Sequence, residues 1–225
     1  MTYAMADVSW GKDSTAMLHV LLDGAEPLDE VVFYDTGMEF MALYAERDRM
    51  LPTLAEAGVR YTELRPRRPM LYDMLCKPIR HRDGTEGRGY GWCGGPCRWG
   101  TSAKTAVLDA HARRAGAGIV YVGIAADETA RIVRPRDASK RLPLVERGVS
   151  EADCLALCYE RGHEWSERGV RLYDVLDRVS CWCCRNKNLR ELSAMREALP
   201  EYYGMLRALE QSIGEPMKKR AGFLE

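Results

Sequence analysis

The stretch Ser9-Trp10-Gly11-Lys12-Asp13-Ser14-Thr15 decides which fold this sequence predicts. A short apolar run at residues 3–8 comes before it, and a helical pattern of apolar residues follows it. A strand, a glycine turn and a helix N-terminus in this order bind phosphate, because unpaired backbone N–H groups and the helix dipole favour an anion there. Gly11 allows a ligand to approach closely, Lys12 adds a positive charge, and the hydroxyl groups add donors. An ordinary strand-to-helix turn with a serine cap is the alternative, and the Walker A pattern G-x-x-x-x-G-K-[ST] is absent.

The composition describes a protein with a sizeable core and balanced charge. The 225 residues are 46% hydrophobic, and 33 basic residues balance 33 acidic ones. This length fits one domain, or one domain with an extension. Zero net charge provides no overall attraction to nucleic acid, so tRNA is not indicated as a partner. Of the three local basic segments, 65–68, 131–141 and 218–220, we interpret the first and the last as solvated surface.

The sequence also predicts a cellular compartment. The N-terminal residues lack the basic start and apolar run of a signal peptide, and no segment approaches the roughly 20 apolar residues of a membrane span. We therefore expect a cytoplasmic protein without a membrane partner. Eight cysteines in such a protein indicate metal binding or redox chemistry before disulfides.

Strand and helix patterns alternate along the chain. Strands are expected at 4–8, 30–34, 59–64 and 119–123, and helices at 13–22, 40–57, 101–114, 151–160 and 189–198. This order predicts an α/β fold with a parallel sheet that helices cover on both faces. Ligands bind beyond the carboxyl ends of such strands, where residues 9–15 and Asp35-Thr36-Gly37 would lie. The Gly- and Arg-rich segment 77–100 has no clear period and is expected to be a long irregular insert.

Four segments, in family order, resemble the adenine nucleotide alpha-hydrolase (PP-loop) superfamily, within the group of phosphoadenylylsulfate (PAPS) reductases and the small subunit of ATP sulfurylase. Residues 9–15 resemble the PP-loop S-x-G-K-D-S, 32–40 a strand that ends in D-T-G, 123–131 the segment G-x-R-x-x-E-x-x-R, and 142–153 the stretch P-L-x-x-W-T-x-x-D-V. The resemblance covers residues 1–185 and implies a Rossmann-like PP-loop (HUP-type) domain there, with a C-terminal helical extension at 186–225.

The resemblance implies a set of nucleotide-binding residues. They are Ser9, Trp10, Gly11, Lys12, Asp13, Ser14, Thr15, Asp35, Thr36, Gly37, Gly123, Arg131 and Arg141. Position 125 is Ala where many relatives have Arg. Arg131 and Arg141 are expected to replace that contact, since a guanidinium group donates paired hydrogen bonds to phosphate or sulfate.

The intact loop resembles the ATP-using members of the family more than its sulfonucleotide reductases. In the ATP users an acceptor oxygen attacks the α-phosphate, an adenylate forms and pyrophosphate leaves. Charge develops on the phosphoryl oxygens, which requires fixed donors and Mg²⁺. The resemblance therefore implies Lys12 and Asp13 as catalytic residues, with Asp13 or Asp35 in reach of the metal.

Two groups of cysteines lie about 80 residues apart: Cys93 with Cys97, and Cys181 with Cys183 and Cys184. Four thiolates suit a [4Fe–4S] cluster or a tetrahedral zinc ion. The family's iron–sulfur reductases carry a cysteine pair and then C-x-x-C at a similar separation. The resemblance thus implies Cys93, Cys97, Cys181 and Cys184 as metal ligands and favours iron–sulfur over zinc. Cys183 stays open as a spare ligand, a reactive thiol or a packed side chain, and burial of all five as small apolar side chains is the alternative.

Three hypotheses of function follow. In the leading one, the chain is a PP-loop enzyme that uses ATP to adenylate an unidentified acceptor, linked to sulfur transfer by an iron–sulfur cluster near the site. In the second it reduces adenylylsulfate or PAPS, binding an adenine sulfonucleotide. The family's reductases use a cysteine near the C-terminus, and none follows Cys184, so Cys183 would have to be the nucleophile. In the third it is a metal-bound, nucleotide-binding subunit of a larger complex. A homo-oligomer and a partner subunit both stay open.

Overall fold

The computed structural model describes residues 2–93, 96–134 and 136–218. Gly94 and Gly95 of the first cysteine group, and Lys219 and Arg220 of the third basic segment, lie outside the described residues. The chain forms two compact units that interleave along the sequence. Residues 1–35, 41–64 and 104–165 form the first, which we call the sheet unit. Residues 36–40, 65–103 and 166–225 form the second, which we call the cysteine unit.

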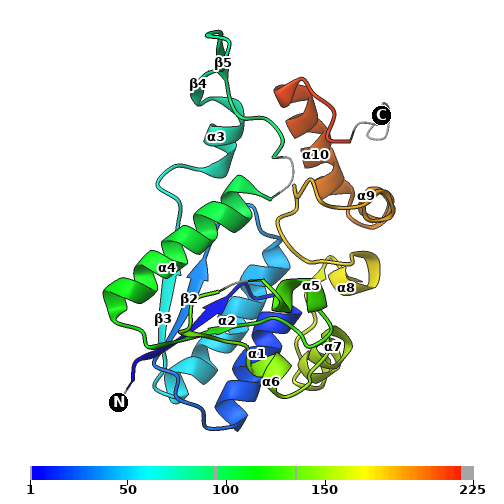
Figure 1. The fold of residues 1–225 in the computed structure, drawn as a ribbon. Coiled ribbons are helices and arrows are strands. Elements are labelled where there is room, and N and C mark those ends of the chain that lie inside the picture. The colour runs from blue at the N-terminus through cyan, green and yellow to red at the C-terminus, as the bar shows by residue number, and fades with distance from the viewer. Residues whose placement is uncertain (1, 94–95, 135, 219–225) are drawn as a thin grey trace. The chain divides into compact units, whose positions relative to one another are not determined.

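Five parallel strands form the sheet of the first unit, in the order β3-β2-β1-β6-β7 (Figure 1). They are β1 (Ala4–Val8), β2 (Glu30–Tyr34), β3 (Arg60–Leu64), β6 (Ile119–Val122) and β7 (Lys140–Arg141). In central β1, Ala6 pairs with Val31 on one side and Tyr121 on the other. All five residues of β2 are buried, the pattern of a parallel strand that is covered on both faces. The four expected strands are confirmed. Strand β7 was not predicted, because two residues are too few to show the alternating pattern of a strand.

Helices cover both faces of this sheet. The sheet unit contains α1 (Lys12–Asp23), α2 (Met41–Glu56), α4 (Lys104–Ala115), α5 (Thr129–Ile132), α6 (Pro143–Glu146) and α7 (Glu151–Glu160). Val32 and Phe33 point to opposite faces, because successive strand residues alternate. Val32 shares an apolar cluster with Leu108 of α4, whereas the ring centroids of Phe33 and Tyr44 of α2 lie 6.4 Å apart. The expected α/β fold is therefore confirmed as a Rossmann-like parallel sheet between helices.

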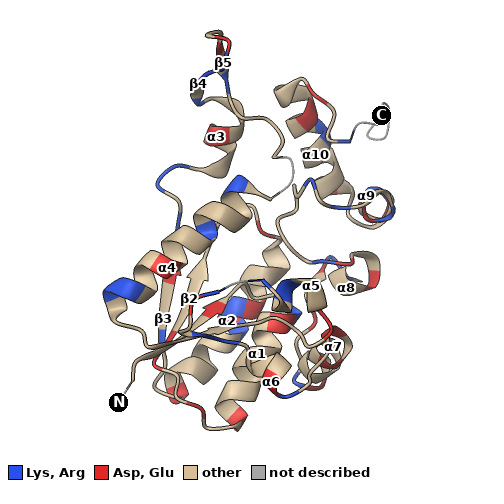
Figure 2. Ribbon diagram, viewed as in Figure 1, with Lys and Arg blue, Asp and Glu red and all other residues tan. Residues whose placement is uncertain are grey.

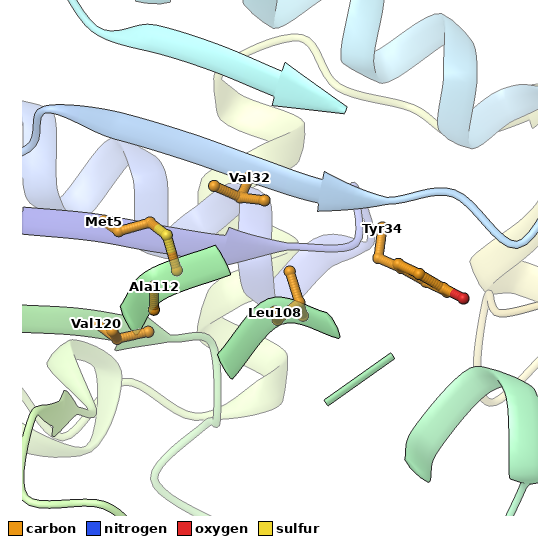
Figure 3. Packing of buried hydrophobic residues seen from close by; sticks show 6 residues of the cluster. All are labelled: Met5, Val32, Tyr34, Leu108, Ala112 and Val120. Atoms are coloured by element: carbon orange, nitrogen blue, oxygen red, sulfur yellow. The ribbon is translucent and has the colours of Figure 1, made fainter. Parts of the chain in front are cut away.

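The apolar cluster on the α4 face joins three strands to one helix (Figure 3). Its buried members are Met5, Val32, Tyr34, Leu108, Ala112 and Val120. Burial of an aliphatic or aromatic side chain of this size stabilises a fold by about 1.5–3 kcal/mol. The cluster fixes neighbouring strands in one register, so the loops after β1 and β6 leave the sheet at defined positions.

The cysteine unit is built from short elements. It contains α3 (Met70–Leu75), the antiparallel pair β4 (Pro78–Arg80) and β5 (Glu86–Arg88), the π-helical turn η1 (Arg98–Ala103), the antiparallel pair β8 (Ser166–Glu167) and β9 (Val170–Arg171), and the helices α8 (Leu172–Val175), α9 (Leu189–Ala198) and α10 (Pro200–Ile213). α10 packs on α9 and α3. α9 begins at a capping box, in which Asn188 Oδ1 accepts from Glu191 N at 2.9 Å and Glu191 Oε2 accepts from Asn188 N at 2.8 Å.

The structure changes two expectations about secondary structure. The insert at 77–100 is not irregular throughout, since β4 and β5 form a hairpin inside it. The helix expected at 101–114 begins at Lys104, because the preceding residues form η1. Helices form as expected after residue 186, while the domain boundary at 185/186 stays a prediction. In the three described ranges, no helix has both the length and the apolar character that a membrane span requires.

Candidate nucleotide site and candidate metal centre

The loop after β1 leads directly into α1. Gly11 is the N-cap residue, with φ −81° and ψ 169°, and no side chain caps the helix. The hydroxyl group of Ser14 turns back into the loop, where it accepts from Ser9 N at 3.1 Å and donates to Gly11 O at 3.1 Å. An uncapped helix start leaves backbone N–H groups and the positive end of the helix dipole for an anion. The structure thus gives residues 9–15 the strand–turn–helix geometry that the sequence predicted.

The end of β6 approaches the same helix start. β1 is flanked by β2 and β6, so the chain leaves β1 toward one side and later returns on the other, which is the switch point where α/β sheets bind ligands. A Cβ atom on Gly123 would lie 2.9 Å from Ser14 Cα and 3.1 Å from Asp13 O. Only glycine fits there without a shift. The fold therefore brings Gly123 together with the loop at 9–15.

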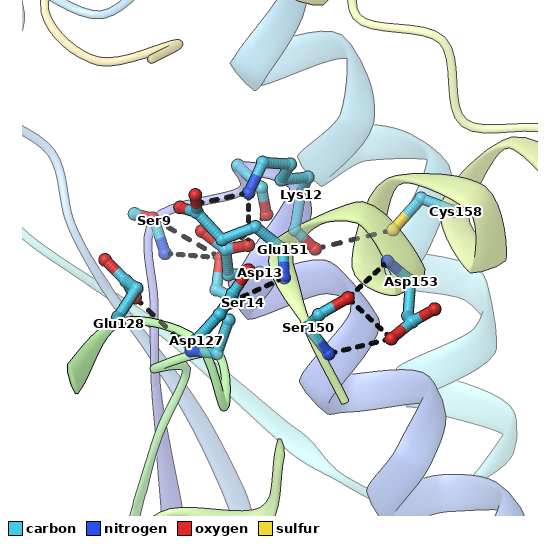
Figure 4. Close-up of polar contacts among 12 residues, drawn as sticks. Ser9, Lys12, Asp13, Ser14, Asp127, Glu128, Ser150, Glu151, Asp153 and Cys158 are labelled. Atoms are coloured by element: carbon cyan, nitrogen blue, oxygen red, sulfur yellow. Dashed lines mark hydrogen bonds and ion pairs between the residues drawn. The ribbon is translucent and has the colours of Figure 1, made fainter. Parts of the chain in front are cut away.

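Lys12 is almost fully buried and is surrounded by carboxylates (Figure 4). Its Nζ lies 2.6 Å from Asp13 Oδ1 and 3.3 Å from Glu151 Oε1. Burial lowers the pKa of Lys12, but the two carboxylates more than offset that effect and raise the pKa above its usual value. The ammonium group is therefore charged at neutral pH, and a bound phosphate would have to replace at least one of these carboxylates.

Three acidic side chains meet beside Lys12. Carboxylate oxygens of Asp13, Glu128 and Glu151 lie within 4.8 Å of one another. They come from the first turn of α1, the residue before α5 and the first residue of α7. Burial raises the pKa of Asp13, as expected for a carboxylate withdrawn from water. Mg²⁺ prefers oxygen ligands, so this carboxylate set fits the ion that the resemblance implies.

Glu128 and Glu151 were not singled out as site residues in the sequence. Both lie in segments that carry the resemblance, but nothing local indicated that they would meet Asp13. Asp127 helps to hold them, because its carboxylate accepts from the backbone N of Glu151 at 2.9 Å (Figure 4). The loop after β6 and the start of α7 are thereby tied together.

The two arginines expected to contact an anion are paired with carboxylates. Arg131 Nη1 lies 2.7 Å from both carboxylate oxygens of Glu128. Arg141, on the edge strand β7, pairs with Glu146. Arg131 thus lies beside the acidic group, whereas in the described part of the chain Arg141 forms no hydrogen bond or ion pair with it.

Other residues that were expected to contact the nucleotide either have buried side chains or belong to the cysteine unit. The side chains of Trp10 and Thr15 are fully buried, and Trp10 has φ +61°, a strained conformation for a bulky residue. Asp35 is buried and accepts from the Tyr44 hydroxyl at 2.6 Å. Thr36 and Gly37 belong to the cysteine unit.

The cysteine unit contains a cavity of about 360 Å³. The five cysteines singled out in the sequence all line it: Cys93, Cys97, Cys181, Cys183 and Cys184. Among the described residues, however, no three of these sulfurs lie within 4.8 Å of one another. The structure therefore gathers the expected thiols around one cavity, at separations wider than those of ligands on one metal ion.

Backbone groups and neighbouring oxygens surround these sulfurs. Cys93 Sγ accepts from Arg98 N at 3.0 Å, and Cys97 Sγ accepts from Gly100 N at 3.2 Å. Such N–H···S bonds stabilise the negative charge of a metal-bound thiolate. Cys181 Sγ lies 3.5 Å from Thr36 Oγ1, so the D-T-G segment borders the second cysteine group within this unit.

Cys183 does not have the environment of a nucleophile. It is 2% exposed, and burial raises its pKa to about 12. Thiolate is the reactive form of cysteine, and a thiol with such a pKa is almost entirely protonated at neutral pH. This burial disfavours the hypothesis that Cys183 attacks a sulfonucleotide.

Lys187 lines the same cavity and has no counter-ion close by. It is 3% exposed, its Nζ lies 3.5 Å from Arg178 O, and no carboxylate of the described chain is within 4.0 Å of it. Burial lowers its pKa, and the charges that favour its protonated form are those of Glu191 and of the cysteines. The ring centroid of Phe40 lies 5.1 Å from this Nζ, but a buried ammonium group without a counter-ion is still costly, so the cavity suits a negatively charged occupant. The sequence signal for this residue was only its position three places after Cys184.

No protein-family model matches this chain, and no curated protein matches it.

Proposed function

We propose that this chain is a PP-loop enzyme of the PAPS reductase type that binds ATP and adenylates an acceptor, releasing pyrophosphate. The observation that carries the proposal is the contact of Gly123 with the uncapped start of α1 at the switch point of a parallel sheet. A helix N-terminus in this position binds phosphate, and the Lys12 ammonium group lies at the same turn. Together these features support a site for a nucleoside triphosphate.

The residues of the loop have separate roles in this reaction. Backbone N–H groups of α1 would hold the phosphates, and Lys12 would move from Asp13 to a phosphoryl oxygen as charge develops there. Asp13, Glu128 and Glu151 would hold Mg²⁺, which neutralises phosphate charge when it is bound. An acceptor oxygen then attacks the α-phosphorus, and the bond to the leaving pyrophosphate breaks.

For the second unit, we propose a metal centre bound by Cys93, Cys97, Cys181 and Cys184, as a [4Fe–4S] cluster with zinc as the alternative, linked to sulfur transfer. The shared cavity, the N–H···S bonds and the buried ammonium of Lys187 support a negatively charged thiolate centre. Four thiolates with either metal carry net negative charge, which would compensate Lys187. A zinc ion would require these sulfurs to move closer together, whereas in a [4Fe–4S] cluster each thiolate binds a different iron.

The nucleotide proposal is tested by ATP-dependent pyrophosphate release from anaerobically purified protein, screened over acceptors. Lys12→Met should lower the rate by about 100-fold or more, because it removes a donor that acts on the developing charge. Lys140→Met is a matched control, since Lys140 Nζ also lies 2.6 Å from a carboxylate, that of Asp109, in the same unit. Failure to bind ATP at millimolar concentration would refute the proposal.

The metal proposal has its own measurement. Protein prepared without oxygen should be brown and contain iron and acid-labile sulfide, whereas zinc, a d¹⁰ ion, would leave it colourless. Protein that holds neither iron nor zinc after reconstitution would refute the metal centre and leave the nucleotide proposal standing.

A further inference from the structure

Positive charge is concentrated in one part of the cysteine unit. Residues 65–103 contain eight Arg and Lys against three Asp and Glu, which gives +5, so the rest of this electrically neutral chain carries −5. The basic residues lie before α3, along the β4–β5 hairpin and at the start of η1 (Figure 2). Zero net charge therefore conceals a segregation that the composition could not reveal.

Seven cations of this segment have no carboxylate at ion-pair distance in the described part of the chain. Within the described chain no carboxylate lies within 4.0 Å of the following side chains: Arg67, Arg68, Lys77, Arg80, Arg82, Arg88 and Arg98. All of them except the half-buried Lys77 are exposed. Two of the three acidic neighbours are hydrogen-bonded elsewhere: Asp83 accepts from Thr85, and Asp73 accepts from the Trp99 indole. The third, Glu86, is the cross-strand partner of Arg80 in the hairpin.

Arg47, Arg60, Lys140, Arg147 and Arg161 of the sheet unit each have a carboxylate oxygen within 4.0 Å. Pairing of this kind is the usual fate of basic side chains near acidic ones. Its absence at residues 67–93 and 96–98 leaves an excess of positive charge for a ligand.

Aromatic rings hold several of these cations in place. Arg98 Cζ lies 3.7 Å and Lys77 Nζ 4.8 Å from the centroid of the Tyr90 ring, and Arg68 Cζ lies 5.8 Å from that of Tyr72. Tyr72 is 38% exposed. The pKa of Tyr90 is lowered, first by its hydrogen bond with Lys77, in keeping with the local positive field. Alternating guanidinium and aromatic groups are the surface on which unstacked bases pack.

The backbone presents these side chains on a fixed frame. Gly89 N donates to Lys77 O, Tyr90 N to Asp73 O and Gly91 N to Met74 O, so the base of the hairpin is tied to α3. Gly89 has φ +67°, and a Cβ there would lie 2.1 Å from Met74 O, so only glycine permits this contact. The positions of Tyr72, Lys77 and Tyr90 are thus coupled within the unit.

We propose that residues 67–93 and 96–98 form a binding surface for single-stranded nucleic acid. Phosphate groups would contact the exposed guanidinium groups, and one or two bases would stack on Tyr72 and the Arg98–Tyr90 pair. An acidic protein would satisfy the charge but leave the aromatic rings without a matching partner, and a duplex would keep its bases inside. The surface adjoins the proposed metal centre, because Arg98 N donates to Cys93 Sγ, but neither a bound metal nor ATP supplies any of its contacts.

The test uses the full chain and fluorescence anisotropy with labelled 20-nucleotide probes of RNA and DNA, single-stranded and duplex. Single strands should bind more tightly than duplexes, and the logarithm of the affinity should fall linearly with that of the salt concentration. Comparison of RNA with DNA identifies which sugar is preferred. Absence of binding to either single strand at low salt, or tighter binding to duplex or to anionic phospholipid vesicles, would overturn the proposal.

Variants locate the surface. Arg80→Ser with Arg88→Ser should weaken binding about 10-fold or more and reduce the salt slope by about 1–2, since two phosphate contacts are lost. Arg113→Ser with Arg114→Ser removes the same charge from two exposed residues of α4 and should change affinity less than about twofold. Tyr72→Leu should weaken single-strand binding by about 5-fold or more at constant charge. Equal effects of the two arginine pairs, in variants whose thermal unfolding matches the parent, would refute the assignment.

Discussion

The sheet unit and the cysteine unit differ in how they compensate buried charge. In the sheet unit Lys12 has two carboxylates within 3.3 Å, and His163 Nδ1 lies 2.6 Å from Glu46 Oε2. In the cysteine unit Lys187 is equally buried, yet among the described residues no carboxylate reaches it. The difference teaches that the buried cation of the first unit has counter-ions within the protein, whereas the buried cation of the second has none at ion-pair distance among the described residues.

The two units also differ in their apolar packing. The sheet unit buries contiguous strands such as β2 between helices, which supplies a core independent of any ligand. Among its described residues, the cysteine unit has only two-residue and three-residue strand pairs, which are marginal on their own. A metal centre would add to the stability of this unit, because metal binding to a site formed on folding is folding free energy.

The largest expected effect follows from removing a thiolate of the proposed centre. Cys184→Ser should abolish metal binding and speed amide hydrogen exchange in α9 by about 100-fold or more, while exchange in α1 stays unchanged. Metal analysis and hydrogen exchange read by mass spectrometry check this. Cys76→Ser is the control, since Cys76 is exposed and does not line the cavity. Equal metal content in Cys184→Ser and Cys76→Ser would contradict the proposal that the cysteine unit, unlike the sheet unit, is stabilised by a metal centre.

A pH titration addresses the buried polar network of the sheet unit. His19 Nε2 lies 2.8 Å from His163 Nε2, and burial, followed by the charge of His163, lowers the pKa of His19 to about 4. Its pKa in the unfolded chain is about 6.5, so the unfolded state binds the extra proton between these values. Stability should be complete above about pH 6.5 and should fall, by about 3 kcal/mol at most, as the pH drops toward 4.

Denaturant unfolding as a function of pH measures that dependence. His19→Gln should flatten the slope between pH 4.5 and 6.5 by about one proton. His81→Gln, at an exposed position of the cysteine unit, should leave the slope as it is. If the pH dependence of unfolding is the same in His19→Gln as in the parent, the buried histidine pair is not its cause.

A methyl group at Gly123 tests the candidate nucleotide site. Gly123→Ala should destabilise the protein by about 1–3 kcal/mol and weaken ATP binding, because the added Cβ meets the first turn of α1. Gly204→Ala, in α10, meets nothing within 4 Å and should stabilise by about 0.5–1 kcal/mol. Calorimetric titration with ATP and denaturant unfolding measure both. Unchanged ATP affinity in Gly123→Ala would show that ATP does not bind at the switch point beside Gly123.

The smallest expected effect is that of Lys187→Met, which tests the comparison of the two units most directly. This substitution should raise the stability of the metal-free protein but lower its affinity for the metal. Lys187→Met should stabilise the metal-free protein by about 1 kcal/mol, because an unpaired buried charge is removed. It should weaken metal binding by about 10-fold, because a compensating cation is lost. Thermal unfolding of the apoprotein and competition with a chelator provide the two readouts. A loss of stability without metal would mean that Lys187 has a compensating partner inside the unit.

Local patterns were sufficient for most of the regular structure. The helices expected at 151–160 and 189–198 have the bounds of α7 and α9, since each begins at a capping box, at Ser150 and at Asn188. The β4–β5 hairpin was missed, because its three-residue strands lie in a Gly- and Arg-rich segment without alternation. The start of α4 was placed too early, because a π-helical turn and an α-helix share similar residue preferences.

The candidate sites also contain some residues that the sequence predicted and others that it did not. The loop at 9–15 and the cysteine groups were found from the sequence, because their signals are contiguous residues. Glu128 and Glu151 were not, because they meet Asp13 only after β6 and α7 reach the first turn of α1. Basic segment 65–68 was interpreted as solvated surface, since the lack of carboxylate partners cannot be recognised before side chains are placed.

The sequence by itself determined the order of strands and helices, the glycine turn before α1 and the supply of thiols, because hydrophobic periodicity and turn chemistry act over a few neighbouring residues. Only the tertiary structure decided which carboxylates surround Lys12, that five cysteines line one cavity, and that Lys187 is buried without a counter-ion. Those outcomes depend on strand order and on packing between segments far apart in the sequence, such as Lys12 and Glu151, which are 139 residues apart. Electrostatic compensation depends on distances that no local pattern encodes.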